Sequence, residues 1–359
     1  MMKLKEAFLG IQEVKAWSEN LKQPGRHLLT GLSGSAKTLF LAENFTAKKV
    51  SQIVVCDDLY HAQQLVDDLE NVLPPAKVHL FPVEEMMASE MATSSPEFKA
   101  QRVLALDALT SEEPQMVVTS LSGIRRFLPQ KELWQQSKFE LKLGQEYDLT
   151  QLVEKLHQMG YMRQKQVERP GDFALRGSIL DIFLLGQDVP VRADFFDTEL
   201  DSLRTFSVAD QRSLANITEI EVLPATDFIA TKEDLQQAAQ ALEKASSKQK
   251  DATEFIEVLS EHVARFNKGD LAASDLALAE YIYPQKTSLF DYLATDGLVV
   301  FDDYPRLREK EKQLCQEEQQ WQVDQLAKKR LLPKAVLANN LSDLEKKLKC
   351  PEIFLALFQ

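Results

Sequence analysis

Residues 31–38 read Gly-Leu-Ser-Gly-Ser-Ala-Lys-Thr and lie between an apolar stretch at 27–30 and a stretch with helical spacing. The phosphate-binding pattern G-x-x-x-x-G-K-[ST] is matched except at one position, because Ala36 stands where the last glycine is required. A Cβ there crowds the backbone N–H groups that close around phosphate oxygens. Lys37 and Thr38, which would reach the phosphates and Mg²⁺, are kept. The stretch predicts a degenerate P-loop lobe of the α/β class.

A second feature of a nucleotide site follows the apolar strand predicted at 297–301. Asp302 stands in the position of a Walker B acid, and Asp303 replaces the glutamate that more usually orients the attacking water. The sequence contains no second P-loop-type lobe to supply an arginine finger. We therefore expect no catalytic residues, no required cofactor and at most weak residual ATP or phosphate binding. The residues assigned to this degenerate nucleotide site are Gly31, Gly34, Lys37, Thr38 and Asp302. The alternative interpretation is a tight strand-to-helix turn kept by an inherited fold.

Composition and charge narrow the classes of function. The 359 residues carry a formal net charge of −13, so the overall field does not favour DNA binding. The three cysteines, Cys56, Cys315 and Cys350, are far apart and show no metal-ligand spacing, which predicts no metal site and fits a reducing cytoplasm. No apolar run is long enough for a membrane span, so we expect no membrane association.

The hydrophobic pattern divides the chain into three parts. Residues 1–137 alternate short apolar strands with helical stretches, which predicts a parallel sheet covered by helices. This lobe is expected to be completed by about 285–359, where a charged helix is predicted at 306–329 and either a strand or a linker at 351–359. Residues 138–224 form a separate α+β domain, in which Thr150 is expected to cap a helix. Residues 225–284 form a mainly helical insert. The strands expected in the first part are 27–30, 53–56, 78–81 and 116–119, and the helices 38–45, 59–72, 96–109 and 121–128.

The α+β domain carries an unusual surface. A strand predicted at 189–196 alternates an apolar face with a face that holds Arg192, Asp194 and Phe196. The preceding stretch, 172–183, is predicted as one strand, with Phe173, Leu175 and Ile179 on its apolar face and Arg176 on the other. If the chain turns back near 186–188, Arg176 and Phe196 share one face of the sheet.

Two interpretations of this surface are possible. Arginines beside an exposed aromatic residue are typical of a protein–protein hot spot. Alternatively, the arginines pair within the domain, with Asp172 or Asp194, and Phe196 packs under a loop. The residues alone do not decide between these interpretations.

Longer blocks of sequence carry a family resemblance. Glu168-Arg169-Pro170-Gly171-Asp172-Phe173-Ala174-Leu175-Arg176-Gly177-Ser178-Ile179-Leu180-Asp181-Ile182-Phe183 resembles the signature stretch of the bacterial transcription-repair coupling factors (Mfd), and the block at 191–204 resembles the next one. The resemblance covers essentially the whole chain but only the N-terminal, UvrB-like module of the family. The RNA-polymerase-binding domain and the ATP-dependent translocase motor would lie beyond residue 359.

The resemblance implies a fold, a partner and a site. It implies a degenerate RecA/UvrB-like lobe (domain 1A), a helical domain 1B and a domain 2 that binds the repair protein UvrA through Arg176, Arg192 and Phe196, to which we add Asp194. It implies a non-catalytic recruitment module that brings nucleotide excision repair to stalled RNA polymerase, with RNA polymerase and double-stranded DNA bound by other regions of the family.

Two alternatives stay open. One is a nucleotide-binding or ATPase lobe of a DNA translocase, and the other is a UvrB-like clamp on damaged DNA. The second is disfavoured because residues 81–98, near which UvrB inserts an aromatic hairpin, contain no tyrosine or tryptophan to stack on bases.

Overall fold

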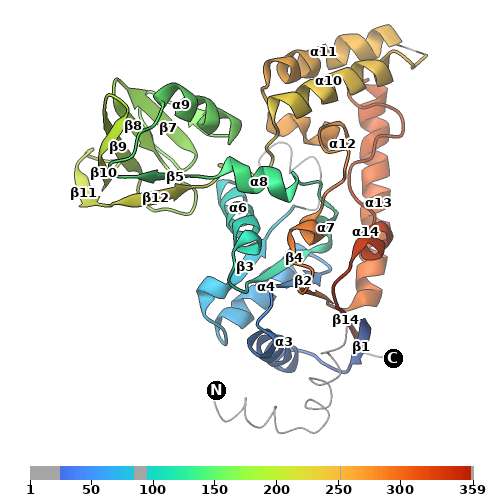
Figure 1. Ribbon diagram of the computed structural model, residues 1–359. Helices are drawn as coiled ribbons and strands as arrows, with labels where there is room; N and C mark the ends of the chain where they lie inside the picture. The colour runs from blue at the N-terminus through green and yellow to red at the C-terminus, as the bar shows by residue number, and fades with distance from the viewer. Residues whose placement is uncertain (1–24, 85–94, 251, 357–359) are drawn as a thin grey trace.

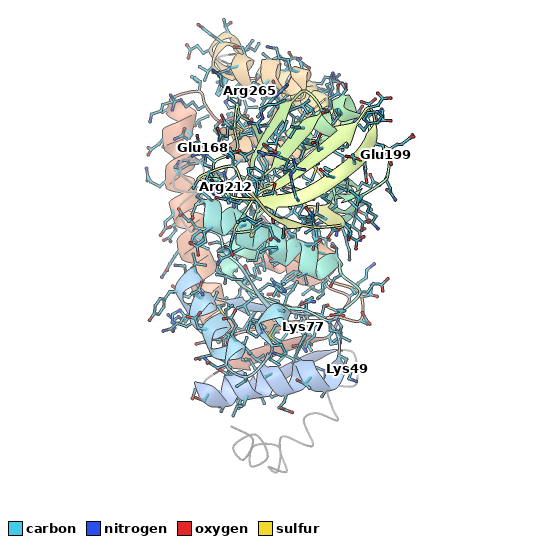
Figure 2. The ribbon with its side chains drawn as sticks, turned by 90° about the vertical axis from the view of Figure 1, so that its left-hand side faces the viewer. Lys49, Lys77, Glu168, Glu199, Arg212 and Arg265 are labelled. Atoms are coloured by element: carbon cyan, nitrogen blue, oxygen red, sulfur yellow. The ribbon has the colours of Figure 1, made fainter. Side chains whose placement is uncertain are left out.

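The computed structural model describes residues 25–84, 95–250 and 252–356. Within these residues the chain forms a lobe built on a parallel sheet, a domain built on a mainly antiparallel sheet (the antiparallel domain), and a helical part (Figure 1). A view from the side shows Lys49 and Lys77 on the lobe, Glu199 on the antiparallel sheet and Arg265 in the helical part (Figure 2). The predicted α/β fold class, with a separate domain, is confirmed.

The lobe is organised around a six-stranded parallel sheet with the strand order β1-β14-β13-β2-β4-β3. Its inner strands are buried on both faces and read as continuous apolar runs, as expected for a sheet covered on both sides. The helices α3 and α4 pack on one face, and α6 and α7 pack on the other. The bounds are β1 Arg26–Thr30, α3 Ser35–Lys48, β2 Gln52–Cys56, α4 Leu59–Glu70, η1 Pro75–Lys77, β3 Val78–Phe81, α6 Pro96–Thr110, β4 Met116–Ser120, α7 Leu121–Arg125, α8 Lys131–Ser137, β13 Leu298–Phe301 and β14 Glu352–Ala356.

The last described segment is a strand rather than a linker. β14 pairs in parallel with β1 on one side and with β13 on the other. β14 therefore lies between β1, which precedes the P-loop-type turn, and β13, which precedes Asp302.

The antiparallel domain contains a correction to the predicted strands. The stretch 172–183 is not one strand but a hairpin of β7 and β8, which turns at Gly177, where φ is 63°, and Ser178. The turn reverses the side-chain parity, so Ile179 lies opposite Arg176 and Asp194 instead of sharing the apolar face of Phe173. The sheet order is β11-β10-β9-β8-β7-β6. The bounds are β5 Phe139–Lys142, α9 Leu149–Gln158, β6 Met162–Arg163, β7 Asp172–Arg176, β8 Ile179–Ile182, β9 Val191–Phe196, β10 Glu199–Phe206, β11 Ser213–Asn216 and β12 Glu219–Val222.

The cap of α9 is also corrected. Asp148, not Thr150, is the N-cap residue, and its carboxylate accepts hydrogen bonds from the backbone N–H groups of Thr150 and Gln151. Both residue types favour this position, so the pattern alone placed the start of the helix two residues late.

The helical part is the insert of the lobe, and the long helix α13 packs against both. α10 (Lys232–Ser246) starts at a capping box formed by Thr231 and Asp234, and packs against α11 (Ala252–Lys268). The 3₁₀ segments η2 and η3 span Ala273–Leu278 and Leu289–Tyr292, with α12 at Ala279–Ile282 and α14 at Leu341–Lys347. α13 (Tyr304–Ala327) confirms the predicted charged helix. Its Leu307 and Leu314 lie in the apolar core of the lobe, whereas Trp321 packs on the helical part. The helix runs alongside both parts (Figure 1). None of the helices in the described ranges has the length and apolarity needed to cross a bilayer.

A buried ionic group holds the connection between the antiparallel domain and the helical part against the lobe. Asp227, in that connection, accepts hydrogen bonds of 2.8 Å from Nε of Arg102 and 2.8 Å from Nε of Arg126. The Arg102 and Asp227 side chains are each only 1% exposed. Burial raises the pKa of Asp227, but the two arginines outweigh it and hold the pKa well below its usual range.

The substitution Asp227→Asn tests this group. It removes the charge of the carboxylate that both buried guanidinium groups share, and we expect the free energy of unfolding at pH 7 to fall by about 3–5 kcal/mol. Because the pKa of Asp227 is lower in the folded chain than in the unfolded chain, the stabilisation is complete above about pH 4 and is lost as the pH falls toward the folded-state value. Urea titrations measure both effects. Asp296→Asn, at an exposed aspartate of the lobe, is the control, and a loss no larger than that of the control would contradict the assignment.

Candidate functional site

The degenerate P-loop connects β1 to α3 in the arrangement that the motif requires. Gly31 and Gly34 have φ values of 85° and 51°, in the left-handed region that favours glycine, and a Cβ at either position would meet no atom within 4 Å. α3 then starts at Ser35, so Lys37 and Thr38 lie in its first turn. Both glycines therefore adopt conformations that favour glycine, and Ala36 stands where the motif has its last glycine.

The structure brings Lys37 and Asp302 together. The Lys37 ammonium donates a hydrogen bond of 2.6 Å to Oδ2 of Asp302, and the two side chains are 23% and 14% exposed. The Thr38 hydroxyl is buried and has no hydrogen-bond partner among the described residues. A phosphate that approached this turn would meet a lysine already neutralised by a carboxylate. This pairing opposes phosphate binding independently of Ala36.

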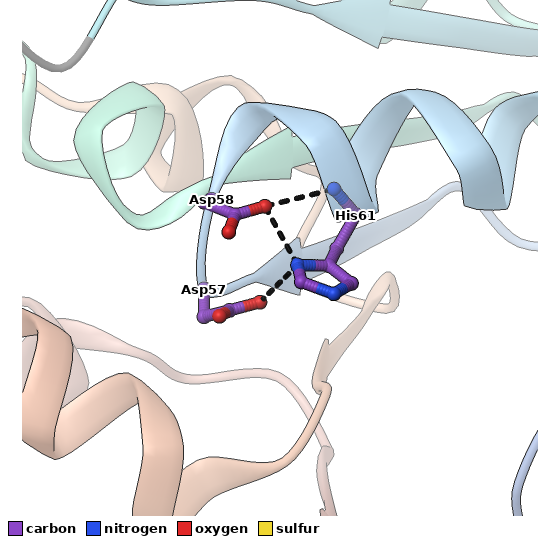
Figure 3. A group of neighbouring side chains, drawn as sticks. All are labelled: Asp57, Asp58 and His61. Carbon is purple, nitrogen blue, oxygen red and sulfur yellow. Dashed lines mark hydrogen bonds and ion pairs between the residues drawn. The ribbon is translucent and has the colours of Figure 1, made fainter.

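Another polar cluster lies at the carboxyl end of β2. Nδ1 of His61 is 3.1 Å from a carboxylate oxygen of Asp57 and 2.7 Å from one of Asp58 (Figure 3). Asp58 is the N-cap of α4 and accepts the backbone N–H of His61, while Asp57 pairs with Arg306 at 2.6 Å. Partial burial raises the pKa of Asp58, but the hydrogen bonds from His61 outweigh it and lower the pKa. These contacts give each carboxylate a structural role, and we assign no metal to the cluster.

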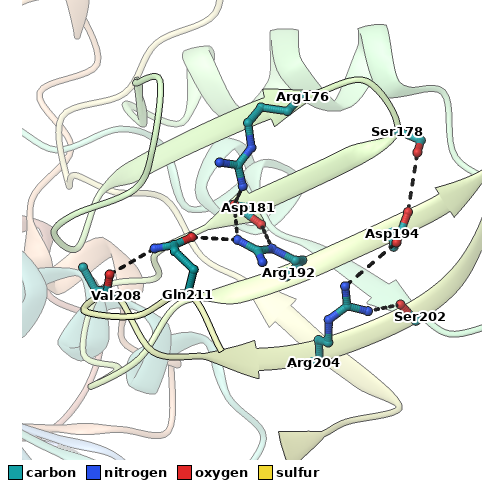
Figure 4. A network of polar contacts seen from close by, with 9 residues as sticks. All are labelled: Arg176, Ser178, Asp181, Arg192, Asp194, Ser202, Arg204, Val208 and Gln211. Atoms are coloured by element: carbon teal, nitrogen blue, oxygen red, sulfur yellow. Dashed lines mark hydrogen bonds and ion pairs between the residues drawn. The ribbon is translucent and has the colours of Figure 1, made fainter. Parts of the chain in front are cut away.

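The predicted docking surface is organised by a residue that sequence reasoning missed. Asp181, on the central strand β8, lies between Arg176 on β7 and Arg192 on β9 (Figure 4). Its carboxylate accepts a hydrogen bond of 2.6 Å from Nη2 of Arg176, and bonds of 2.7 Å and 2.9 Å from Nε and Nη2 of Arg192. These bonds raise the pKa of the Arg192 guanidinium.

The arginines thus pair within the domain, as one sequence interpretation held, but with Asp181 rather than with Asp172 or Asp194. Asp172 instead accepts the backbone N–H groups of Glu168 and Arg169. A turn at Gly177 puts Asp181 on a strand of its own, β8, where it faces Ala174 on β7 and Arg192 on β9.

Exposure divides the predicted contact residues into two groups. Phe196 is 80% exposed and Arg176 is 44% exposed, so both can reach a partner. The Arg192 side chain is only 12% exposed, and its guanidinium stacks on the Phe206 ring at 4.1 Å from the centroid. Asp194 is 35% exposed and lies 3.9 Å from Nη2 of Arg204. The alternative in which Phe196 packs under a loop is wrong.

One known protein family matches the antiparallel domain of the chain. Residues 139–228 match the family described as the UvrB interaction domain. The match covers the antiparallel domain and makes it similar to this class of interaction domains.

Two relatives align with most of the chain. The chain is 34% identical over 349 residues to the transcription-repair-coupling factor of Bacillus subtilis (strain 168), which covers 95% of this chain and 29% of the relative. It is 34% identical over 300 residues to that of Staphylococcus haemolyticus (strain JCSC1435), which covers 81% of this chain and 25% of the relative. The chain therefore spans less than a third of the length of these relatives. The resemblance predicted from the sequence, to the UvrB-like module of transcription-repair coupling factors, is confirmed.

The stretch 81–98, considered above for an aromatic DNA-gripping hairpin, is described only in part. Phe81 ends β3 and is fully buried, and Phe98 lies in α6. Residues 85–94 lie outside the described residues.

The ion pair at the degenerate loop yields a prediction. Asp302→Asn removes the carboxylate that competes for Lys37, so we expect binding of Mg²⁺-free ATP to strengthen by about tenfold, which corresponds to about 1.4 kcal/mol. Isothermal titration calorimetry measures the affinity. Asp303→Asn, at the neighbouring acid, is the control and should leave the affinity unchanged. An Asp302→Asn variant that binds ATP no better than the wild type would show that the ion pair does not limit binding.

Proposed function

We propose that this chain is a non-catalytic recruitment module that docks UvrA and thereby brings nucleotide excision repair to stalled RNA polymerase. The observation that carries the proposal is the pair of exposed residues Phe196 and Arg176, on one face of a domain that matches the UvrB interaction domain family. The similarity to transcription-repair-coupling factors supports a role in transcription-coupled repair.

The chemistry of the surface fits a binding role. Phe196 offers a large apolar ring that a partner can desolvate, and such aromatic residues dominate binding energy at interfaces. Arg176 offers guanidinium N–H groups for a carboxylate of the partner, a charge-assisted contact. Asp194 lies between Arg204 and the Ser178 hydroxyl and can accept a hydrogen bond from the partner. We propose that Arg192 contributes mainly by supporting the exposed residues from inside the domain, because little of its own side chain is exposed.

The division of labour within the chain follows from this role. We propose a degenerate motor lobe formed by 1–137 and 285–359, a UvrA-binding domain at 138–224 and a helical domain 1B at 225–284. RNA polymerase and double-stranded DNA would be bound by other regions of the longer protein, in the cytoplasm. Docking would need no cofactor, and the chain would catalyse no reaction.

A second candidate function is residual nucleotide binding. The glycine conformations at 31 and 34 and the positions of Lys37 and Asp302 favour it, because they keep the framework of a phosphate site. The ion pair between the last two residues and the side chain of Ala36 weigh against tight binding.

Measurement of binding between this chain and purified UvrA tests the docking proposal. We expect Phe196→Ala to weaken binding by about 30-fold or more, because loss of a hot-spot aromatic costs about 2 kcal/mol or more. The unfolding temperature should stay unchanged, since the ring is exposed. Tyr60→Ala, which removes a ring that is 66% exposed on the lobe, is the matched control and should bind as the wild type does. The proposal fails if the wild type does not bind UvrA, or if Phe196→Ala binds undiminished.

A further inference from the structure

The buried carboxylate of Asp181 is shared by two arginines with different surroundings. Asp181 itself is 0% exposed, and it lies on the strand between those that carry Arg176 and Arg192. A buried carboxylate is costly unless it is paired, and here both of its oxygens accept hydrogen bonds from guanidinium groups. One negative charge therefore serves two positive charges, which leaves the group with an excess of one positive charge at the surface.

The two arginines are held to different degrees. Arg192 is fixed by two bonds to Asp181, by a 2.9 Å bond to Oε1 of Gln211 and by its stacking on Phe206. Gln211 is in turn held by a 3.0 Å bond to the carbonyl oxygen of Val208. Arg176, by contrast, has a single described hydrogen bond, from Nη2 to Asp181, and remains 44% exposed. A guanidinium group has five N–H donors, so Asp181 orients Arg176 while leaving donors for another acceptor.

We propose that Asp181 is the positioning residue of the docking surface. It touches no partner itself, but it fixes the guanidinium plane of Arg176 so that the remaining N–H groups meet a carboxylate of the partner. This inference rests on the proposed docking of UvrA and adds to it the chemistry that Arg176 recognises, an acidic side chain. Preorganisation of this kind strengthens binding because the arginine loses less conformational freedom when the partner arrives.

A double-mutant cycle separates positioning from a general effect on folding. We expect Asp181→Asn to weaken UvrA binding by about tenfold, and Arg176→Ala to do so by a similar factor in the wild-type background. In the Asp181→Asn background, Arg176→Ala should cost less than about threefold, because an arginine that is no longer oriented contributes little. Asp188→Asn, at an exposed aspartate of the same domain, is the matched control and should bind as the wild type does.

A second background covers the case in which Asp181→Asn unfolds the domain. The double variant Asp181→Asn/Arg192→Gln removes the carboxylate together with one guanidinium, so no additional unpaired charge is buried. The cost of Arg176→Ala is measured again in that background, where we also expect less than about threefold. Far-ultraviolet circular dichroism establishes folding at the temperature of the binding assay.

The outcomes distinguish the inference from the function on which it rests. If the wild type binds UvrA and the penalties of Asp181→Asn and Arg176→Ala multiply, Asp181 does not act through Arg176 and the positioning role is overturned. If the wild type does not bind UvrA, the proposed function is overturned and the inference with it. Rotation of the Arg176 guanidinium group, followed by ¹⁵N NMR without any partner, should be hindered in the wild type and faster in Asp181→Asn. Equal rotation rates in the two proteins would also contradict the positioning role.

Discussion

One buried carboxylate links the three parts of the structure. Asp227 lies where the antiparallel domain gives way to the helical part, and it is bound by Arg102 of α6 and by Arg126, the residue that follows α7. Arg102 also donates to the carbonyl oxygen of Pro82, at the end of β3, so the group is anchored to the sheet itself. The antiparallel domain also shares one buried apolar cluster with the lobe, which includes Phe81 and Phe173. The paired charges add directional contacts to this apolar packing, because a buried carboxylate is stable only where its guanidinium partners are in place.

The fold class and most elements of the lobe were predictable because their signals are local. Short apolar runs at 53–56 and 116–119 alternate with helical spacing, and both became buried parallel strands. The sequence pattern predicts one long strand across Gly177-Ser178 and misses the hairpin of β7 and β8. The apolar positions change there from odd numbers (Phe173, Leu175) to even numbers (Leu180, Ile182), and that change of parity was the missed signal.

At the candidate sites, too, local patterns predict individual residues but not the contacts between them. Motif spacing found Lys37 and Asp302 separately, and period-two alternation found Arg176, Arg192 and Phe196. Neither pattern predicts the ion pair between Lys37 and Asp302, because the two residues are far apart in the chain. Their contact depends on the position of β14 between β1 and β13. Nor does either pattern predict which of Arg176 and Arg192 is exposed to solvent. Arg192 is buried by its contacts with Asp181, Phe206 and Gln211, and such contacts leave no periodic pattern in a single sequence.

The position of β14 has a consequence for the order in which the protein takes shape during synthesis. The antiparallel sheet is continuous in the chain, since all its strands lie between Met162 and Asn216. The parallel sheet is not: its second strand, β14, ends at Ala356, whereas its edge strand β1 begins at Arg26. Because domains generally fold as units while the chain is still growing, the antiparallel domain can complete its sheet first. The lobe must keep the side of β1 open until more than three hundred further residues have left the ribosome, as the pairing of Arg26 with Glu352 requires.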